Sequence, residues 1–225
     1  MAAKSPTSVT IYGRLSFPVF GYNEAVARNQ KSNFPAADKA TVTPEFNLLV
    51  EDAQLKKLTD HVLQEFLPFC AEQHKKGEKK NALSPDEVKR IVKLIEAQDW
   101  DAQPPYIPVK AVPEKTQELA PETVAMVKVK GNRGVDIDQK AIVNDETELV
   151  VPDPDILKFP VVKPVNQTVH QLYPGAYVAA TLNLYAFISG KLPGFSASAG
   201  VAVFKADADR FGGGIALDED EIFLD

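Results

Sequence analysis

The sequence predicts a mainly β fold: a small, partly open barrel of five or six strands with a helical insertion. Three observations lead to this fold class. Segments of alternating apolar and polar residues recur along the 225-residue chain, and turn residues bound most of them. Two helical patterns fall together between the second and third predicted strands, and no helix separates the other strands. The chain therefore lacks a β-α-β alternation, which argues against a parallel sheet.

Two strands are expected near the N-terminus. Thr7–Phe20 alternates in character, which predicts one buried face and one polar face. The buried face holds Val9, Ile11, Leu15 and Phe17, and the polar face holds Thr10, Tyr12, Arg14 and Ser16. Pro44–Val50 predicts a second strand, in which Phe46, Leu48 and Val50 are in phase.

A helical insertion is expected over residues 52–98. Apolar residues recur at helical spacing from Asp52 to Gln73, and Pro68 is expected to bend or end that helix. A basic linker, residues 74–80, follows. Ser84-Pro85-Asp86-Glu87 is a capping box with proline at the first helical position, so it predicts a second helix reaching about Gln98.

Three longer strands are expected in the second half of the chain. Glu122–Lys130 is the first, and weaker patterns follow around 141–143 and 149–151. Ala176–Ser189 is the best strand pattern in the chain, and a hairpin leads from it to a last strand at Phe195–Lys205. The apolar face of the best strand holds Val178, Ala180, Leu182, Leu184, Ala186 and Ile188.

The charge of the chain is concentrated at one end. Residues 207–225 carry seven acids and one base, which equals the net charge of −6 of the whole chain. Residues 1–206 are therefore neutral overall and can still carry basic patches. We expect a folded domain at 1–206 and a flexible acidic tail at 207–225, which begins with a glycine hinge at 212–214.

The residues that usually carry catalysis or bind metals are poorly represented. The three histidines, His61, His74 and His170, have no spacing typical of metal ligands. The single cysteine, Cys70, lies among apolar residues and is expected to be buried rather than nucleophilic. We therefore expect no enzyme, no metal and no cofactor. Asp136 and Asp138 leave a nuclease as a remote alternative.

The sequence also bears on location. No apolar run is long enough for a membrane-spanning helix, and the N-terminus lacks the apolar stretch of a secretion signal. A lone cysteine fits a reducing compartment. We therefore expect the cytoplasm, and no membrane partner.

Aromatic and basic side chains share the polar faces of three strands. Single-stranded nucleic acid needs this combination, because bases stack on rings at about 1–3 kcal/mol each while cations neutralise the backbone. Packing in a second core under the helices is the alternative for Tyr185 and Phe187, and for Phe187 it is an equal one. A solvated strand edge is the alternative for Lys128 and Lys130. The strand residues concerned are Tyr12, Arg14, Lys128, Lys130, Tyr177 and Tyr185, with Arg133 in the turn that follows Lys130.

Residues 173–206 resemble a known family. Tyr173-Pro174-Gly175-Ala176-Tyr177-Val178, leading into Leu182-Asn183-Leu184-Tyr185-Ala186-Phe187, is similar to a motif of the phage single-stranded DNA-binding proteins related to that of phage T7. A strand of small and apolar residues and an acidic end follow, as in that family. Upstream, Phe46–Val50 resembles its second strand, and Pro105–Lys110 resembles its proline-rich segment.

The resemblance implies an OB-fold that coats single-stranded DNA in phage replication and recombination, in the cytoplasm of the host cell. It also implies a tail that recruits replication proteins and competes with DNA for the groove. T7-type tails end on an aromatic residue, whereas here two residues follow Phe223. The tail residues concerned are Asp218, Glu219, Asp220, Glu221 and Phe223, and the groove is expected to use Tyr12, Arg14, Tyr106, Lys110, Lys128, Lys130, Arg133, Tyr177 and Tyr185.

Several alternatives stay open at this level. The main alternative is a structural or adaptor protein that binds protein partners through its barrel and tail. A homodimer also stays open, as does the question of which face of Ala176–Ser189 lines the groove.

Overall fold

The computed structural model describes residues 5–20, 43–102, 105–131, 137–141, 172–206 and 208–211. Predictions that concern other residues lie outside this part of the chain. They include the predicted strand at 149–151 and the part of the predicted strand around 141–143 that lies beyond Ala141.

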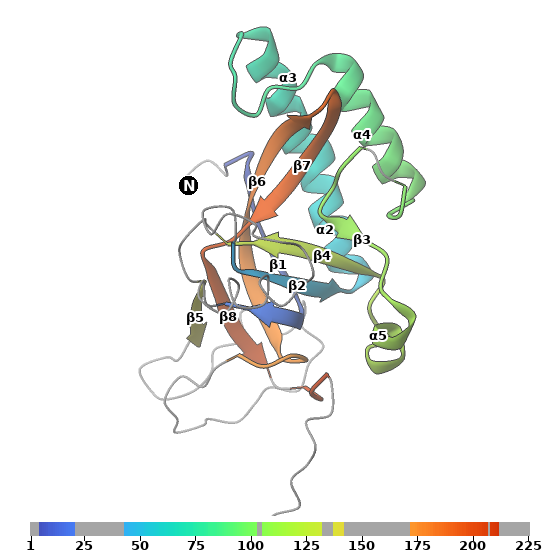
Figure 1. The fold of residues 1–225 in the computed structure, drawn as a ribbon, viewed down its shortest axis with the longest axis vertical. Coiled ribbons are helices and arrows are strands. Elements are labelled where there is room, and N and C mark those ends of the chain that lie inside the picture. Colours follow the sequence, from blue (N-terminus) through green and yellow to red (C-terminus); the bar gives the residue numbers. More distant parts are fainter. Residues whose placement is uncertain are drawn as a thin grey trace, which may run out of the picture.

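Five strands form a closed barrel (Figure 1). Neighbouring strands pair in the order β1-β2-β4-β7-β6, and β6 pairs back with β1. Every pair in this circle is antiparallel except β4 with β7, which is parallel. The predicted mainly β barrel of OB-fold type is therefore confirmed, with its circle closed. The bounds are β1 Ser8–Val19, β2 Glu45–Val50, β4 Ala125–Lys130, β6 Tyr177–Ser189 and β7 Leu192–Ser198.

Three further strands extend the sheet. β8 (Val201–Ala206) pairs with the start of β6, β5 (Asp138–Ala141) pairs with β8, and β3 (Val109–Lys110) pairs with β4. The prediction of one unbroken last strand at Phe195–Lys205 is wrong. The strand is interrupted at Ala199, whose N–H donates to the carbonyl oxygen of Lys130 in β4 at 2.9 Å. β7 therefore borders β4, whereas β8 borders β5.

The barrel interior is apolar, as the alternating patterns predict. The side chains of Val9, Ile11, Leu15, Phe46, Leu48, Val50, Val178, Ala180, Leu182 and Leu184 are all buried. The predicted apolar face of β6 ends before Ile188, whose side chain is 51% exposed. There the hairpin of β6 and β7 extends past the barrel toward the helices (Figure 1). Because the hairpin extends past the barrel, the side chain of Ile188 is exposed to solvent.

The first predicted helix is continuous but changes its winding. It consists of α2 (Asp52–His61), the π-helical segment η2 (Val62–Phe66) and α3 (Leu67–Lys75). The N–H of Leu67 donates to the carbonyl oxygen of Val62, five residues earlier. Pro68 follows directly and has no N–H to donate, so the wider π turn accommodates it without ending the helix.

The second predicted helix is α4 (Pro85–Ala97), and it begins with the predicted capping box. The Ser84 side chain accepts a hydrogen bond from the Glu87 N–H, and the Glu87 carboxylate accepts one from the Ser84 N–H. α4 packs against β7, so the helices cover one end of the molecule, opposite β5 and β8 (Figure 1). A short helix that the sequence did not predict, α5 (Glu114–Leu119), lies in the proline-rich loop.

Within the described ranges, no helix is both long and apolar enough to cross a membrane.

Candidate nucleic-acid interface

The outer surface of the barrel is hollowed along β7. Outward positions on β7 carry small residues, Gly194, Ser196 and Ser198, while Phe195 and Ala197 point inward and are buried. The strands on either side carry long outward side chains. A strand with small side chains between two strands with long ones produces a depression, because adjacent strands lie only about 5 Å apart.

This depression has a volume of about 490 Å³, and we call it the groove. Its lining residues are Tyr106, Ile107, Pro108, Lys110, Lys128, Lys130, Tyr185, Phe187, Ser189, Phe195 and Ser196. Five of the nine predicted DNA-binding residues are therefore brought together here: Tyr106, Lys110, Lys128, Lys130 and Tyr185. Ile107, Pro108 and Phe195 are buried and give the groove an apolar floor.

The lysines of β4 and the rings of β6 lie on opposite sides of β7. Lys130 of β4 is in register with Ser198 of β7, and Tyr185 of β6 is in register with Ser196 of β7. The lysine-bearing strand and the tyrosine-bearing strand are therefore separated by one strand, or about 10 Å. A chain that runs along β7 meets ammonium groups on one side and rings on the other.

The segment that carries Tyr106 fills the gap where β4 and β7 diverge. The Tyr106 N–H donates to the Pro193 oxygen at 3.1 Å, and the Phe195 N–H donates to the Tyr106 oxygen at 2.9 Å. On the other side, the Lys128 N–H donates to the Pro108 oxygen at 2.8 Å. This loop segment therefore belongs to the sheet, and its backbone bonds hold Tyr106 in place.

Three rings form a row that crosses β7 at Gly194, from Tyr106 in the loop segment to Phe187 and Tyr185 in β6. Tyr106 stacks on Phe187 at a centroid distance of 6.5 Å and an interplanar angle of 22°, and Tyr185 lies 6.5 Å from Phe187. Tyr106 and Tyr185 are 36% and 38% exposed, so their faces remain accessible. Gly194 makes the row possible. A Cβ atom there would lie 2.7 Å from the Tyr106 oxygen and 2.9 Å from Phe187 Cζ.

The cationic side of the groove holds crowded charges. Burial lowers the pKa of Lys110; nearby Asp101 raises that pKa, and the ammonium of Lys128 lowers it further. Lys128 Nζ also lies 2.9 Å from Glu45 Oε2, an ion pair whose two side chains are both partly solvent-exposed. An anion placed between these ammonium groups would stabilise their charged forms and offset the desolvation of Lys110.

The basic linker ends beside the aromatic row. Asn81, directly after Lys80, accepts a hydrogen bond from the N–H of Ala186 at 2.8 Å through its side-chain oxygen. Ala186 lies between Tyr185 and Phe187 in β6. The exposed linker cations therefore approach the edge of β6 that β7 does not cover.

Three predicted groove residues lie elsewhere. Arg14 is only 6% exposed, although the alternation of β1 placed it on a polar face. Its guanidinium donates to the carbonyl oxygens of Gly175, Leu119 and Asp209 at 3.2, 3.2 and 2.7 Å. It also pairs with Glu122 at 3.2 Å. These partners use its donors, so Arg14 is not placed to meet a ligand in the groove.

Aromatic rings complete what we call the Arg14 cluster: Arg14, Glu122, Gly175, Tyr177, Asp209 and Phe211. The guanidinium carbon lies 4.3 Å from the Phe211 ring centroid and 5.7 Å from that of Tyr177. The Tyr177 hydroxyl donates to Glu122 Oε1 at 3.4 Å. Burial, with the charge of Glu122, raises the pKa of Tyr177 to about 12.

The Arg14 cluster also holds residues that precede the acidic tail. The Phe211 N–H donates to the Pro174 oxygen at 3.0 Å, and the Tyr173 hydroxyl bonds to both the N–H and the oxygen of Ala208. Contact with the barrel therefore continues past Ala206, the expected domain boundary. Gly175 has a φ of +105°, and a Cβ there would overlap the Asp209 oxygen.

Tyr12 lies outside the groove under helix α2. Its N–H donates to the Gln54 side-chain oxygen at 3.1 Å, and Lys57 Nζ lies 5.5 Å from its ring centroid. Tyr12, Arg14 and Tyr177 thus do not line this groove, and their contact with DNA stays a prediction. Arg133, Asp136, His170 and the tail residues Asp218, Glu219, Asp220, Glu221 and Phe223 lie outside the described residues.

Little in the described ranges supports other chemistry. No group of three or more His, Cys, Asp or Glu side chains that could hold a metal ion occurs there. The prediction of a buried Cys70 is confirmed, and burial raises the pKa of its thiol to about 12. Such a thiol is a poor nucleophile at neutral pH.

Sequence reasoning did not assign several residues of the groove. From the sequence, Phe187 fits either the core or the surface, and the roles of Gly194 and Ser196 are not evident. The signal that could have found them is the outward series of small residues on β7, which marks where a sheet surface is hollow.

Comparisons with known proteins complete the description. No family model and no curated protein sequence matches the chain. Solved structures of similar fold include the single-stranded DNA-binding protein of bacteriophage Enc34, with 13% identity, coverage of 96% of this chain and 90% of that chain, and a TM-score of 0.46. The same protein in complex with single-stranded DNA has 12% identity, coverage of 92% and 90%, and a TM-score of 0.44.

The single-stranded DNA-binding protein gp2.5 of bacteriophage T7 is a further structure of similar fold. It has 10% identity, coverage of 96% of this chain and 98% of that chain, and a TM-score of 0.41.

Proposed function

We propose that the protein binds single-stranded DNA without sequence preference, through the groove along β7. One observation carries the proposal: three rings, Tyr106, Phe187 and Tyr185, and three lysines line one groove over a strand of small residues. Stacking on rings contributes about 1–3 kcal/mol per base and accepts every base. Lysines opposite the rings neutralise the phosphates of the same strand.

The geometry favours a single strand over a duplex. Rings can stack only on bases that are unpaired and turned toward the protein, which a duplex does not offer. The groove also lacks a helix or ribbon projecting toward it that would enter a major groove, in the part of the chain that the structure describes. Single-stranded DNA in phage replication and recombination is the substrate we infer.

The acidic tail completes the proposed function. Residues 212–225 contain five acids, and the cations of the groove are their natural counterparts. We propose that the tail competes with DNA for the groove and recruits replication or recombination proteins when DNA displaces it. Phe211 and the residues before it are held by the Arg14 cluster, so the tail starts from a fixed point.

The binding proposal is tested by titrating fluorescent oligo-dT and a duplex of equal length at several salt concentrations. We expect a strong preference for oligo-dT and an affinity that falls steeply with salt. In Lys128→Ala/Lys130→Ala the salt slope should fall by about 1.4, because each single-strand phosphate contact adds about 0.7. Affinity at low salt should fall roughly tenfold or more.

Lys89→Ala is the matched control, because it removes one exposed lysine that pairs with Asp86 on α4, away from the groove. Equal binding of duplex and oligo-dT would contradict the proposal, as would a salt slope that the double substitution leaves unchanged. Binding to neither nucleic acid would favour the adaptor alternative.

The tail proposal is tested by removing residues 212–225. The deletion starts after Phe211, because that ring packs on Arg14 at 4.3 Å and its loss would disturb the barrel. We expect tighter binding to oligo-dT at low salt, with the difference shrinking at high salt as charges are screened. Unchanged or weaker binding would show that the tail does not compete.

A further inference from the structure

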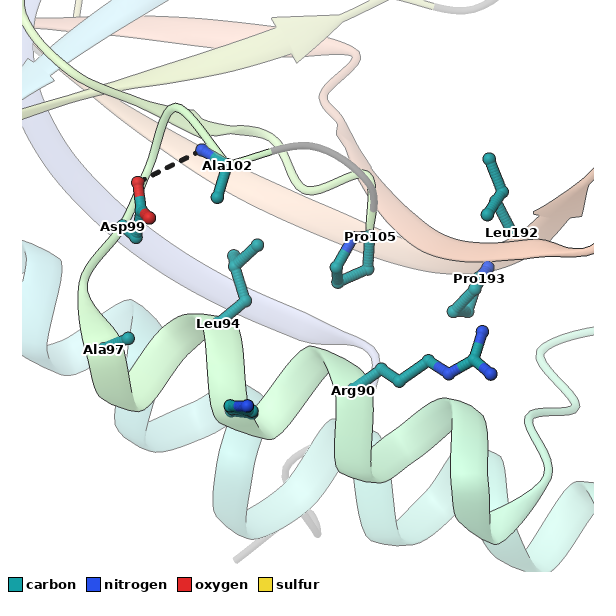
Figure 2. A pocket seen from close by; sticks show the side chains of 9 residues that line it. Arg90, Leu94, Ala97, Asp99, Ala102, Pro105, Leu192 and Pro193 are labelled. Atoms are coloured by element: carbon teal, nitrogen blue, oxygen red, sulfur yellow. Dashed lines mark hydrogen bonds between the residues drawn. The ribbon is translucent and has the colours of Figure 1, made fainter.

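A second hollow, outside the groove, lies between α4 and the hairpin of β6 and β7 (Figure 2). Its volume is about 320 Å³. Its walls are mostly apolar: Leu94 and Ala97 come from α4, Ala102 and Pro105 from the loop that follows, and Leu192 and Pro193 from β7. Figure 2 shows Leu94 directed toward Pro105 across this space, with Arg90 extending toward Pro193.

Cationic groups border the apolar walls. Arg90 and Lys93 of α4 both line the hollow, and neither has an ion-pair partner among the residues that the structure describes. The one acid in the lining, Asp99, accepts a hydrogen bond from the Ala102 N–H at 3.2 Å and so is partly used by the loop. The hollow thus has apolar walls and excess positive charge among its lining residues.

The hollow is a neighbour of the groove. Pro105 lines the hollow and Tyr106 lines the groove, while Pro193 lines the hollow and Phe195 lines the groove. Two residues of an extended strand span about 7 Å, so the two sites lie side by side along β7. The hydrogen bond from the Tyr106 N–H to the Pro193 oxygen joins the walls that separate them.

We propose that this hollow is an additional nucleotide subsite, which takes the next nucleotide of a single strand as it leaves the groove. The base lies against Pro105, Pro193 and Leu94, and Arg90 and Lys93 contact its flanking phosphates. The inference rests on the proposed function of the groove. It implies that the single strand runs from Lys130 along β7 toward α4. It also implies that the binding site is longer than the groove by one or two nucleotides.

The test compares oligo-dT probes from about 4 to about 16 nucleotides. For the full-length protein, affinity should rise with length and then level off. In Arg90→Ala/Lys93→Ala the affinity should level off one or two nucleotides earlier, and the salt slope for long probes should fall by about 1.4. Affinity for the shortest probes, which the groove alone accommodates, should not change.

Two variants separate the subsite from general charge effects. Ala97→Leu adds apolar volume at an exposed helix position without changing charge. In this variant too, affinity should level off one or two nucleotides earlier than in the wild type. Lys89→Ala removes a positive charge from the same helix but does not line the hollow, and it should leave the length dependence unchanged.

Each outcome is decisive. Suppose that the wild type binds oligo-dT, and that Arg90→Ala/Lys93→Ala and Ala97→Leu both show the length dependence of the wild type. This result would overturn the subsite and leave the groove intact. Failure of the wild type to bind any oligo-dT would overturn the groove as well. An effect of the double substitution that vanishes once residues 212–225 are removed would assign the hollow to an acidic segment instead, and would overturn the subsite.

Discussion

In the groove, tyrosine rings and lysine ammonium groups face solvent, whereas in the Arg14 cluster a guanidinium and two rings are enclosed by the protein. Both regions bring cations and aromatics together on a strand surface. The difference lies in the partners that the chain supplies. Three carbonyl oxygens and one carboxylate surround Arg14, whereas the groove lysines have one ion-pair partner among the described residues, Glu45, which pairs with Lys128.

The contrast shows what distinguishes a binding surface from a structural one. A buried cation must be satisfied by the protein, because an unpaired buried charge is costly. A cation that is to bind a ligand must keep donors free and stay near solvent. The same residue types thus stabilise the barrel at one end and remain available for a ligand along β7.

Arg14→Ala is the change with the largest expected effect. It leaves the oxygens of Gly175, Leu119 and Asp209 without their donor in a buried place, which should cost about 3 kcal/mol of unfolding free energy. Affinity for oligo-dT, measured where the variant is still folded, should stay unchanged. Urea denaturation and a binding titration check both statements.

Arg14→Lys is the informative control for that prediction. It keeps the positive charge but cannot span the same acceptors, so its stability should fall between those of the wild type and Arg14→Ala. If Arg14→Ala were as stable as the wild type but bound DNA poorly, the assignment of Arg14 to structure would be wrong.

Tyr185→Ala should have the opposite profile. The ring is 38% exposed and lines the groove, so its removal should cost about 2 kcal/mol of DNA binding and little stability. Tyr185→Phe keeps the stacking face and should bind nearly as well as the wild type. A large loss of stability with intact binding would show that Tyr185 stabilises the fold and does not bind DNA.

Gly194→Ala should affect both properties at once, by a smaller amount. The new Cβ would crowd the backbone oxygen of Tyr106, which is fixed by its bond from Phe195, and the ring of Phe187. We expect a loss of about 1 kcal/mol in unfolding free energy and a measurable loss of oligo-dT affinity.

Gly200→Ala is the matched control for that substitution. It lies at the break between β7 and β8, where a Cβ would meet nothing within 4 Å. It should leave both stability and binding unchanged. Equal behaviour of the two variants in thermal melts and titrations would mean that Gly194 does not set the position of the ring row.

The sequence predicted the barrel because burial imposes a two-residue period that β1, β2, β4 and β6 display directly. It could not predict the break at Ala199, since that break depends on a bond to Lys130, nearly seventy residues earlier in the chain. The sequence pattern did not predict α5, for a different reason. It is a single short helix of six residues in a proline-rich loop, too short for a helical period to show.

Strand alternation also predicted part of the candidate site. Lys128, Lys130 and Tyr185 follow from strand alternation, because their neighbours point inward. Arg14 has the same alternation and was misplaced, since its burial depends on partners more than a hundred residues away. Alternation tells which face of a strand a side chain occupies, but tertiary contacts decide whether that face is covered.

Tyr177→Phe should have the smallest effect, and its sign should depend on pH. The raised pKa of Tyr177, about 12 in the folded protein, means that the folded state keeps its proton where the unfolded chain loses it. The stability contributed by the hydroxyl is therefore complete below the unfolded pKa of about 10 and is lost as pH rises from there to about 12.

Because the ring is only partly buried, we expect a change of about 1 kcal/mol across that range. Near pH 7 the wild type should be slightly more stable than Tyr177→Phe, since its hydroxyl donates to Glu122. Above pH 10 this advantage should shrink and then reverse. Denaturation midpoints at pH 7 to 12 measure the difference, and a constant gap would show that the Arg14 cluster does not hold this proton.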